Sequence, residues 1–163
     1  MGNLIITQGD ITVFCGDAIV NAANSSLLGG GGVDGAIHRV AGRELFAECA
    51  TLGGCETGDA KITKGYNLKA KYVIHTVGPI FSENKADECK LQLESCYKKS
   101  LELAKQNNCK SMAFPLISAR VYGYPKKQAL QVAVDMIQMY SKNLDVEIVL
   151  FDKEAWGIAQ EDF

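Results

Sequence analysis

The segment from Asn21 to His38, NAANSSLLGGGGVDGAIH, combines polar side chains with four consecutive glycines. Glycine has no side chain to pack and loses much backbone entropy on folding, so a glycine run suits a backbone that bends sharply or approaches a ligand closely. The residues after the run, 33–37, indicate the start of a helix. Because a helix N-terminus presents unpaired N–H groups and the positive end of a dipole, the segment predicts a site for a phosphate-bearing ligand.

Strand-like and helix-like segments alternate around this site. Short apolar runs predict strands at 4–6, 17–21, 60–63, 72–77, 111–116 and 146–151. Helical spacing of apolar residues predicts helices at 34–52, 85–107 and 125–141, followed by a short C-terminal helix that Asp152 caps. About six strands interleaved with three or four helices predict an α/β fold, with helices on both faces of a largely parallel sheet.

Polar residues follow the first two predicted strands. Asp10 comes just after the first strand, and Asn21 and Asn24 lie at the end of the second. In open α/β sheets, ligands bind beyond the carboxyl ends of the strands. These side chains are therefore positioned to contribute to the same site as the glycine run.

The length and charge of the chain limit the classes of protein to consider. With 163 residues, the chain is expected to form a single domain over 1–163. Its 17 basic and 19 acidic residues give a net charge of -2, whereas a dedicated nucleic-acid-binding protein usually carries a basic excess. We therefore expect no nucleic-acid partner, although backbone N–H groups can still bind a phosphate without net positive charge.

The six cysteines and two histidines show neither a CxxC pair nor zinc-finger spacing. We expect free thiols in a reducing cytoplasm, and no metal ion. The start of the chain lacks a signal-peptide pattern, and no apolar run is long enough to span a membrane. These features predict a cytoplasmic protein without a membrane partner, which we expect to be a monomer.

Five segments in this order resemble the macrodomain family, and above all its MacroD-type branch: GDIT at 9–12, NAAN at 21–24, GGGGVDGAIH at 29–38, IHTVGP at 74–79 and ISARVYGYP at 117–125. The resemblance implies a three-layer α/β/α sandwich whose mostly parallel mixed sheet has about six strands, with a cleft for ADP-ribose. It also implies hydrolysis of the ester that joins ADP-ribose to an Asp or Glu side chain of a mono-ADP-ribosylated protein. No cofactor is implied, since ADP-ribose is ligand and product.

ADP-ribose contains an adenine, two riboses and a pyrophosphate, so its site needs a selective polar contact, N–H-rich loops and an apolar slot. The resemblance implies that Asp10 and the N–H of Ile11 read the adenine; otherwise Asp10 is a turn or helix-cap residue. The glycine loop would wrap the pyrophosphate, the loop at 117–125 would form a second anion nest, and Tyr122 would pack against the distal ribose. The implied substrate-binding residues are Asp10, Ile11, Asn21, Gly30, Gly31, Gly32, Val33, Ser118, Ala119, Arg120, Val121, Tyr122 and Phe151.

The resemblance also implies that Asn24 and Asp34 carry the chemistry. Asn24 would hydrogen-bond a hydroxyl of the distal ribose. Asp34 would orient or deprotonate a water aimed at the anomeric carbon, where the carboxylate leaves through an oxocarbenium-like state. Alternatively, Asp34 is the N-cap of the helix that follows. Asn21 is expected to brace the loop rather than touch ligand, and His38 and His75 are expected to be packed or bracing residues.

The sequence departs from the family pattern at Arg120. Family members usually have Ser-Thr-Gly or Ser-Ala-Gly where this chain has Ser-Ala-Arg at 118–120. An arginine in a glycine-only conformation would cost about 1 kcal/mol or more, and its side chain would fill the cleft. Conversely, a guanidinium beside a pyrophosphate makes strong charge-assisted hydrogen bonds.

Three hypotheses therefore remain open at this point. The first is an ADP-ribosyl ester hydrolase with Asn24 and Asp34 in its site. The second is a module that binds ADP-ribose with weak or no turnover, which Arg120 favours. The third is a nucleotide or RNA phosphate binder, or a hydrolase of another derivative such as O-acetyl-ADP-ribose; the net charge of -2 disfavours RNA.

Overall fold

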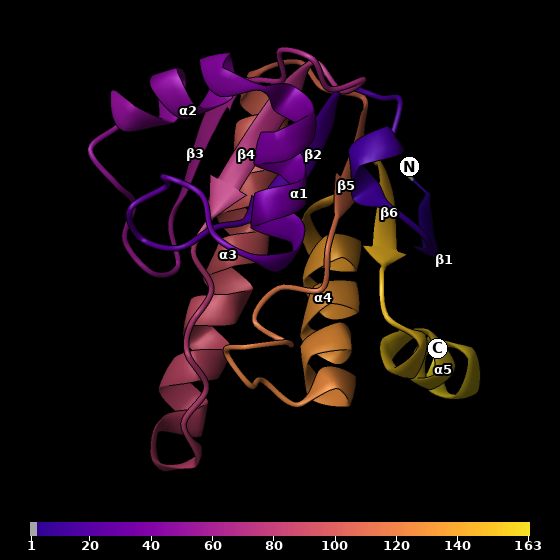
Figure 1. Cartoon of the computed structure of the whole chain (residues 1–163). Coiled ribbons are helices and arrows are strands. Elements are labelled where there is room, and N and C mark those ends of the chain that lie inside the picture. Colours follow the sequence, from indigo (N-terminus) through magenta and orange to yellow (C-terminus); the bar gives the residue numbers. More distant parts are fainter. Residues whose placement is uncertain (1–2) are drawn as a thin grey trace.

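A six-stranded mixed sheet forms the centre of the molecule in the computed structural model, which describes residues 3–163 (Figure 1). The strands are β1 (Leu4–Gln8), β2 (Ala18–Ala22), β3 (Ala60–Lys64), β4 (Tyr72–Thr76), β5 (Ser111–Phe114) and β6 (Asp145–Leu150). Their order across the sheet is β1-β6-β5-β2-β4-β3. Every neighbouring pair is parallel except β3 and β4, so the predicted mostly parallel sheet is confirmed.

Helices cover both faces of this sheet. They are α1 (Gly32–Ala41), α2 (Arg43–Ala50), α3 (Ala86–Gln106), α4 (Lys126–Tyr140) and α5 (Lys153–Asp162). One hydrophobic cluster joins the sheet to α3, α4 and α5, and a second joins it to α1 and α2. Because side chains alternate along a strand, Ala18 and Val20 of β2 enter the first cluster while Ile19 enters the second. The predicted three-layer α/β/α sandwich is therefore confirmed.

The single helix predicted at 34–52 is wrong, because two helices occupy that segment. Gly42 separates α1 from α2 with φ 91°, a left-handed conformation that ends a helix and favours glycine. The α1 helix also begins earlier than predicted, with Gly31 as its N-cap. The described residues thus contain five α-helices, not three or four, besides short 3-10 turns at Ile11–Val13 and Glu83–Lys85.

Loops at the carboxyl ends of the parallel strands lie together at one edge of the sheet. β2 leads into the glycine segment, β5 ends at Phe114 and opens the loop that reaches α4, and β6 ends at Leu150. Phe151 therefore lies beyond the strand that was predicted to include it. The side chain of Asp152 accepts from the N–H of Ala155, which confirms it as the cap of α5.

Candidate functional site

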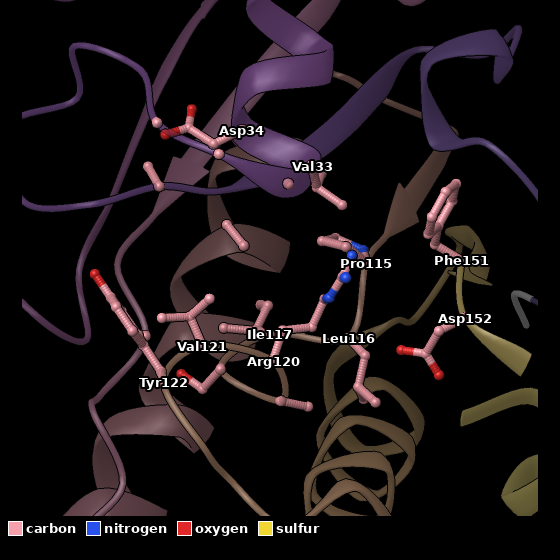
Figure 2. Close-up of a pocket in the computed structure, with 18 of the residues that line it drawn as sticks. Val33, Asp34, Pro115, Leu116, Ile117, Arg120, Val121, Tyr122, Phe151 and Asp152 are labelled. Atoms are coloured by element: carbon pink, nitrogen blue, oxygen red, sulfur yellow. The ribbon is translucent and has the colours of Figure 1, made fainter. Parts of the chain in front are cut away.

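A cavity of about 360 Å³ opens at this edge of the sheet (Figure 2). Its volume lies within the range of small-molecule sites, about 300–1,000 Å³. Most of its wall comes from four segments, 22–24, 30–34, 115–122 and 149–152. Figure 2 shows Asp34 and Tyr122 toward one end of the cavity and Phe151 and Asp152 toward the other. We call these the carboxylate end, after Asp34, and the aromatic end, after Phe151.

Asp34 lies in the first turn of α1, with only 5% of its surface exposed. Gly31, not Asp34, occupies the N-cap position, so the alternative of a capping role is wrong. The pKa of the Asp34 carboxyl is raised because burial disfavours its charged form; a hydrogen bond from Asn21 and the nearby His38 partly oppose this effect. A carboxylate with a raised pKa is better suited to take a proton near neutral pH.

Asn24 and Asp34 approach each other across Gly30. A Cβ atom built on Gly30 would lie 3.1 Å from Asp34 Oδ2 and 3.3 Å from Asn24 Nδ2, so a side chain at this position would crowd both groups. Asn24 Nδ2 donates to the carbonyl of Gly29 (2.9 Å), while Asn24 Oδ1 accepts from the backbone and hydroxyl of Ser26. Asn24 therefore braces the loop as well as lining the cavity, and its second amide N–H is the donor that can reach a ligand.

Asn21 does not line the cavity, which differs from its assignment to the substrate-binding residues. It is fully buried in β2, and its Nδ2 donates to Asp34 Oδ1 at 2.8 Å. The second N–H of this amide points to His75 Nδ1 at 3.2 Å. Asn21 thus braces the site through its side chain, on the side of Asp34 that faces the core.

His75 continues this buried network into β3. Because Asn21 donates to Nδ1, the proton of His75 lies on Nε2, which donates to Thr63 Oγ1 at 2.9 Å. Thr63 in turn donates to the carbonyl of Lys64. Burial lowers the pKa of His75 to about 3, with a further contribution from His38, so the ring stays neutral near pH 7. The expectation that His75 is structural agrees with this placement.

The two loops expected to hold a pyrophosphate face each other across the cavity. Gly30, Gly31, Gly32 and Val33 form one wall, and Ser118, Ala119, Arg120, Val121 and Tyr122 form the other. Ser118 adopts a left-handed backbone with φ 65°, and its hydroxyl donates to the carbonyl of Pro79 at 2.8 Å. The hydrogen bond ties the second loop to the segment that follows β4.

Arg120 extends its guanidinium into the cavity (Figure 2). Its Cζ lies 6.0 Å from the centre of the Phe151 ring, within reach of a cation–π interaction. The non-glycine residues with positive φ do not include Arg120, so the expected strain from a glycine-only conformation is absent. Arg120 therefore places a positively charged side chain inside the cleft without backbone strain.

Asp10 and Ile11 lie outside the cavity wall. Asp10 Oδ1 accepts from the backbone N–H and the hydroxyl of Thr12, which makes it the N-cap of the 3-10 turn. Ile11 is buried in the cluster under α1 and α2. The N–H of Gly9 bonds to the carbonyl of Leu150 (3.0 Å), so this segment adjoins the aromatic end of the cavity without lining it.

Sequence reasoning missed several residues of the wall. These are Ala22, Ala23, Gly78, Pro115, Leu116, Ile117, Val149, Leu150, Asp152 and Ala155. Four of them, Ala22, Ala23, Gly78 and Ile117, belong to the NAAN, IHTVGP and ISARVYGYP segments, and these motifs are the signal that could have identified them. The remaining apolar residues carry no comparable signal, because the same residue types fill the core.

Residues 3–163 show neither a metal-binding cluster nor a membrane-spanning helix. They contain no cluster of three or more His, Cys, Asp or Glu side chains that could hold a metal ion. No helix in this part of the chain is long and apolar enough to cross a membrane.

Comparisons with known proteins agree with the fold. The family model described as Macro domain matches residues 20–133. A Macro domain-containing protein of Mesorhizobium japonicum is 60% identical over 134 residues, covering 82% of this chain and 76% of that protein. Human ADP-ribose glycohydrolase MACROD2 is 56% identical over 146 residues, which are 88% of this chain and 34% of that protein. This chain therefore spans about a third of the length of MACROD2.

Solved structures show the same architecture. The Trypanosoma brucei macrodomain in complex with ADP-ribose superimposes with a TM-score of 0.89 at 41% identity, covering 98% of this chain and 68% of that one. A mutant of the Oceanobacillus iheyensis macrodomain with ADPR gives a TM-score of 0.89 at 42% identity, covering 96% of this chain and 89% of that one. With the matched family model, these similarities establish that the chain belongs to the macrodomain family, in its MacroD-type branch.

Proposed function

We propose that this macrodomain binds ADP-ribose in the cavity and hydrolyses the ester bond between ADP-ribose and an acidic side chain of a mono-ADP-ribosylated protein. The observation that carries the proposal is the buried Asp34 carboxylate at one end of the cavity, beside Asn24 and Gly30. Similar proteins with ADP-ribose in their names or bound in their structures give further support.

The cavity suggests one orientation for the ligand. The pyrophosphate lies between the glycine loop and the loop at 117–122, where backbone N–H groups can bind its oxygens. The distal ribose reaches the end with Asp34 and Tyr122. The adenine lies toward Phe151, whose ring supplies an apolar surface. Asp10 adjoins this end and can contribute only from outside the wall.

In this orientation Asp34 acts on the anomeric carbon of the distal ribose. It positions a water molecule, whose oxygen bonds to that carbon as the bond to the leaving carboxylate breaks. The reaction passes through an oxocarbenium-like state, and the proton released by the water goes to Asp34 or to the substrate's own phosphate. The second N–H of Asn24 fixes a ribose hydroxyl. The products are ADP-ribose and the free acidic side chain.

A gel-based assay on a glutamate-linked mono-ADP-ribosylated protein tests this proposal. We expect release of ADP-ribose by the wild type, and a loss of at least about a hundredfold in Asp34→Ala, as for removal of a positioned acid–base group. Calorimetry of both proteins with ADP-ribose separates binding from turnover. Micromolar binding without release by the wild type would contradict hydrolysis.

A second candidate function is an ADP-ribose-binding module with little turnover. The observation that favours it is the Arg120 guanidinium, which occupies cavity space and must move or bind the ligand. If Arg120 limits turnover, Arg120→Gly will increase the rate of ADP-ribose release in the same assay. If Arg120→Gly releases ADP-ribose at the wild-type rate, Arg120 does not limit turnover, and this argument for the binding module is lost.

A further inference from the structure

A second cavity, of about 470 Å³, opens on the surface formed by the glycine loop, α1 and the start of α2. We call it the α1–α2 cavity. Its lining residues are Leu28, Gly29, Gly30, Gly35, His38, Arg39, Gly42, Arg43 and Phe46. None of these apart from Gly30 lines the cavity that we assign to ADP-ribose.

The charges around the α1–α2 cavity are positive, although the chain as a whole carries -2. Arg39 and Arg43 line it, and neither forms an ion pair within residues 3–163. The N-terminus of α2 also opens here, at Gly42, without a side-chain cap. Glu44, the acidic residue of that first turn, is not part of the lining. The cavity therefore offers unneutralised positive charge to an anionic partner.

Apolar surface lies beside these charges. Leu28 is 44% exposed and Phe46 is 48% exposed, and both line the cavity. A site for a small inorganic anion does not need such a surface. Together, the two arginines and the two apolar side chains match a peptide that carries acidic side chains next to apolar ones.

The α1–α2 cavity meets the ADP-ribose cavity at its carboxylate end. Gly30 lines both cavities, and a Cβ atom built on it would lie 3.1 Å from Asp34 Oδ2. His38 lies in the wall of the α1–α2 cavity with Nε2 3.5 Å from Asp34 Oδ1. Both ring nitrogens of His38 are buried without a hydrogen-bond partner among residues 3–163. Gly30 thus borders both cavities, and His38 joins the wall of the α1–α2 cavity to Asp34 in the wall of the other.

We propose that the α1–α2 cavity binds the acidic peptide segment that flanks the ADP-ribosylated side chain of the substrate protein. This inference rests on the proposed function, because the modified side chain must leave the ADP-ribose cavity at the Asp34 end. An extended chain advances about 3.3–3.6 Å per residue, so the residues next to the modified one can reach the adjoining cavity. Arg39, whose Nη1 lies over Gly35, and Arg43 are the residues that would recognise flanking carboxylates.

Binding of designed peptides tests the inference without depending on turnover. Each peptide carries ADP-ribose on one side chain through a hydrolysis-resistant linkage, flanked on both sides either by glutamates or by glutamines. We expect the wild type to bind the glutamate peptide about tenfold more tightly by calorimetry, equivalent to about 1.4 kcal/mol. Because the arginines are exposed, this preference should shrink as the salt concentration rises.

The double variant Arg39→Gln/Arg43→Gln should bind both peptides with the affinity of the glutamine peptide. Lys99→Gln is the matched control, because it removes a positive charge from an exposed position on α3, across the sheet from α1 and α2. This control should keep the tenfold preference. Free ADP-ribose should bind all three proteins equally.

Three outcomes would overturn this inference and leave the proposed function standing. The wild type could bind both peptides with equal affinity, or the double variant could keep the preference for the glutamate peptide. The double substitution could also weaken only the binding of an ADP-ribose polymer. The last outcome would assign the arginines to phosphates of a neighbouring ADP-ribose unit. Failure of free ADP-ribose to bind the wild type is a different result, because it would overturn the proposed function and this inference together.

Discussion

Asn21 holds Asp34 from the side that faces the core: Asn21 Nδ2 donates to Asp34 Oδ1 at 2.8 Å, while Asp34 Oδ2 faces Gly30 at the cavity. The same amide nitrogen donates to His75 Nδ1 at 3.2 Å, so both of its N–H groups are engaged. Asp34 therefore presents one oxygen to a fixed buried donor and the other to the cavity. A positioning role for Asn21 follows from this geometry, although Asn21 touches no part of the cavity.

Asn21→Ala should move the acidic limb of the pH–rate profile toward higher pH. The hydrogen bond from Asn21 lowers the pKa of Asp34 and partly offsets the effect of burial, so its removal raises that pKa further. If ionised Asp34 is the active form, kcat/KM will be lost at a higher pH than in the wild type. We also expect about a tenfold fall in kcat at neutral pH, equivalent to about 1.4 kcal/mol.

Thr63→Val is the control for Asn21→Ala. It removes the hydrogen bond at the far end of the same network, between Thr63 and His75, without touching Asp34. This variant should lose stability but keep the acidic limb of the wild type. An Asn21→Ala profile with the wild-type acidic limb would show that Asn21 supports the fold and does not act on Asp34.

The layers of the fold could be predicted from the sequence because each depends on local patterns. Apolar runs identified all six strands, and helical spacing identified the covering helices. The break at Gly42 was missed, because apolar residues continue in helical register past it and a lone glycine does not by itself end a helix. The φ of 91° at Gly42 depends on how α1 and α2 pack in the folded chain, which the local sequence does not specify.

The site could be predicted only in part. The glycine loop and Asp34 lie close together in the sequence, so their motif predicts one wall of the cavity. The two side-chain partners of Asn21, Asp34 and His75, come from two other segments of the chain, and no single motif predicts that the Asn21 amide joins them. For Asp10, a motif predicts an adenine contact and the structure shows one carboxylate oxygen in a cap, so the adenine contact stays a prediction.

His75 should make the folded state lose stability as the pH falls. Its pKa is about 3 in the folded protein, against about 6.5 when unfolded, so between these values the unfolded chain binds a proton that the folded chain does not. The contribution of His75 is fully present above about pH 6.5 and is lost toward pH 3, by up to about 1.4 kcal/mol per pH unit.

His75→Gln tests this dependence, because glutamine keeps a donor and an acceptor but does not titrate. Urea unfolding at several pH values should give a flatter fall in the free energy of unfolding for the variant than for the wild type. Titrating groups that do not interact with His75 are common to both proteins and cancel in the difference. Parallel curves between pH 6.5 and 4 would contradict a neutral, buried His75.

Arg120→Ala should weaken the binding of ADP-ribose by about fivefold. The guanidinium extends into the cavity without backbone strain, so it can turn toward a pyrophosphate and form charge-assisted hydrogen bonds. Calorimetry at low and high salt would measure the effect, and Arg120→Lys should retain part of the affinity. Adenosine, which lacks the pyrophosphate, serves as the control and should bind both proteins alike. Tighter binding of ADP-ribose by Arg120→Ala would show that the side chain obstructs the cleft.

Gly78→Ala should disturb the second loop more than it disturbs the fold. A Cβ atom at Gly78 would overlap Ser118 Oγ and lie 2.7 Å from Ile117 Cγ2, so the loop must shift. We expect a loss of about 1–3 kcal/mol in the free energy of unfolding, as for other overpacked sites, and at least tenfold weaker binding of ADP-ribose.

The same substitution at Gly157 in α5 is the control, because nothing lies within 4 Å of its added Cβ and alanine favours a helix. Gly157→Ala should raise stability slightly and leave binding unchanged. Adding Ser118→Gly to Gly78→Ala removes both the overlapping hydroxyl and a non-glycine residue at φ 65°, so it should recover part of the lost stability. If Gly78→Ala binds ADP-ribose as the wild type does, the contact between Gly78 and Ser118 does not set the shape of this loop.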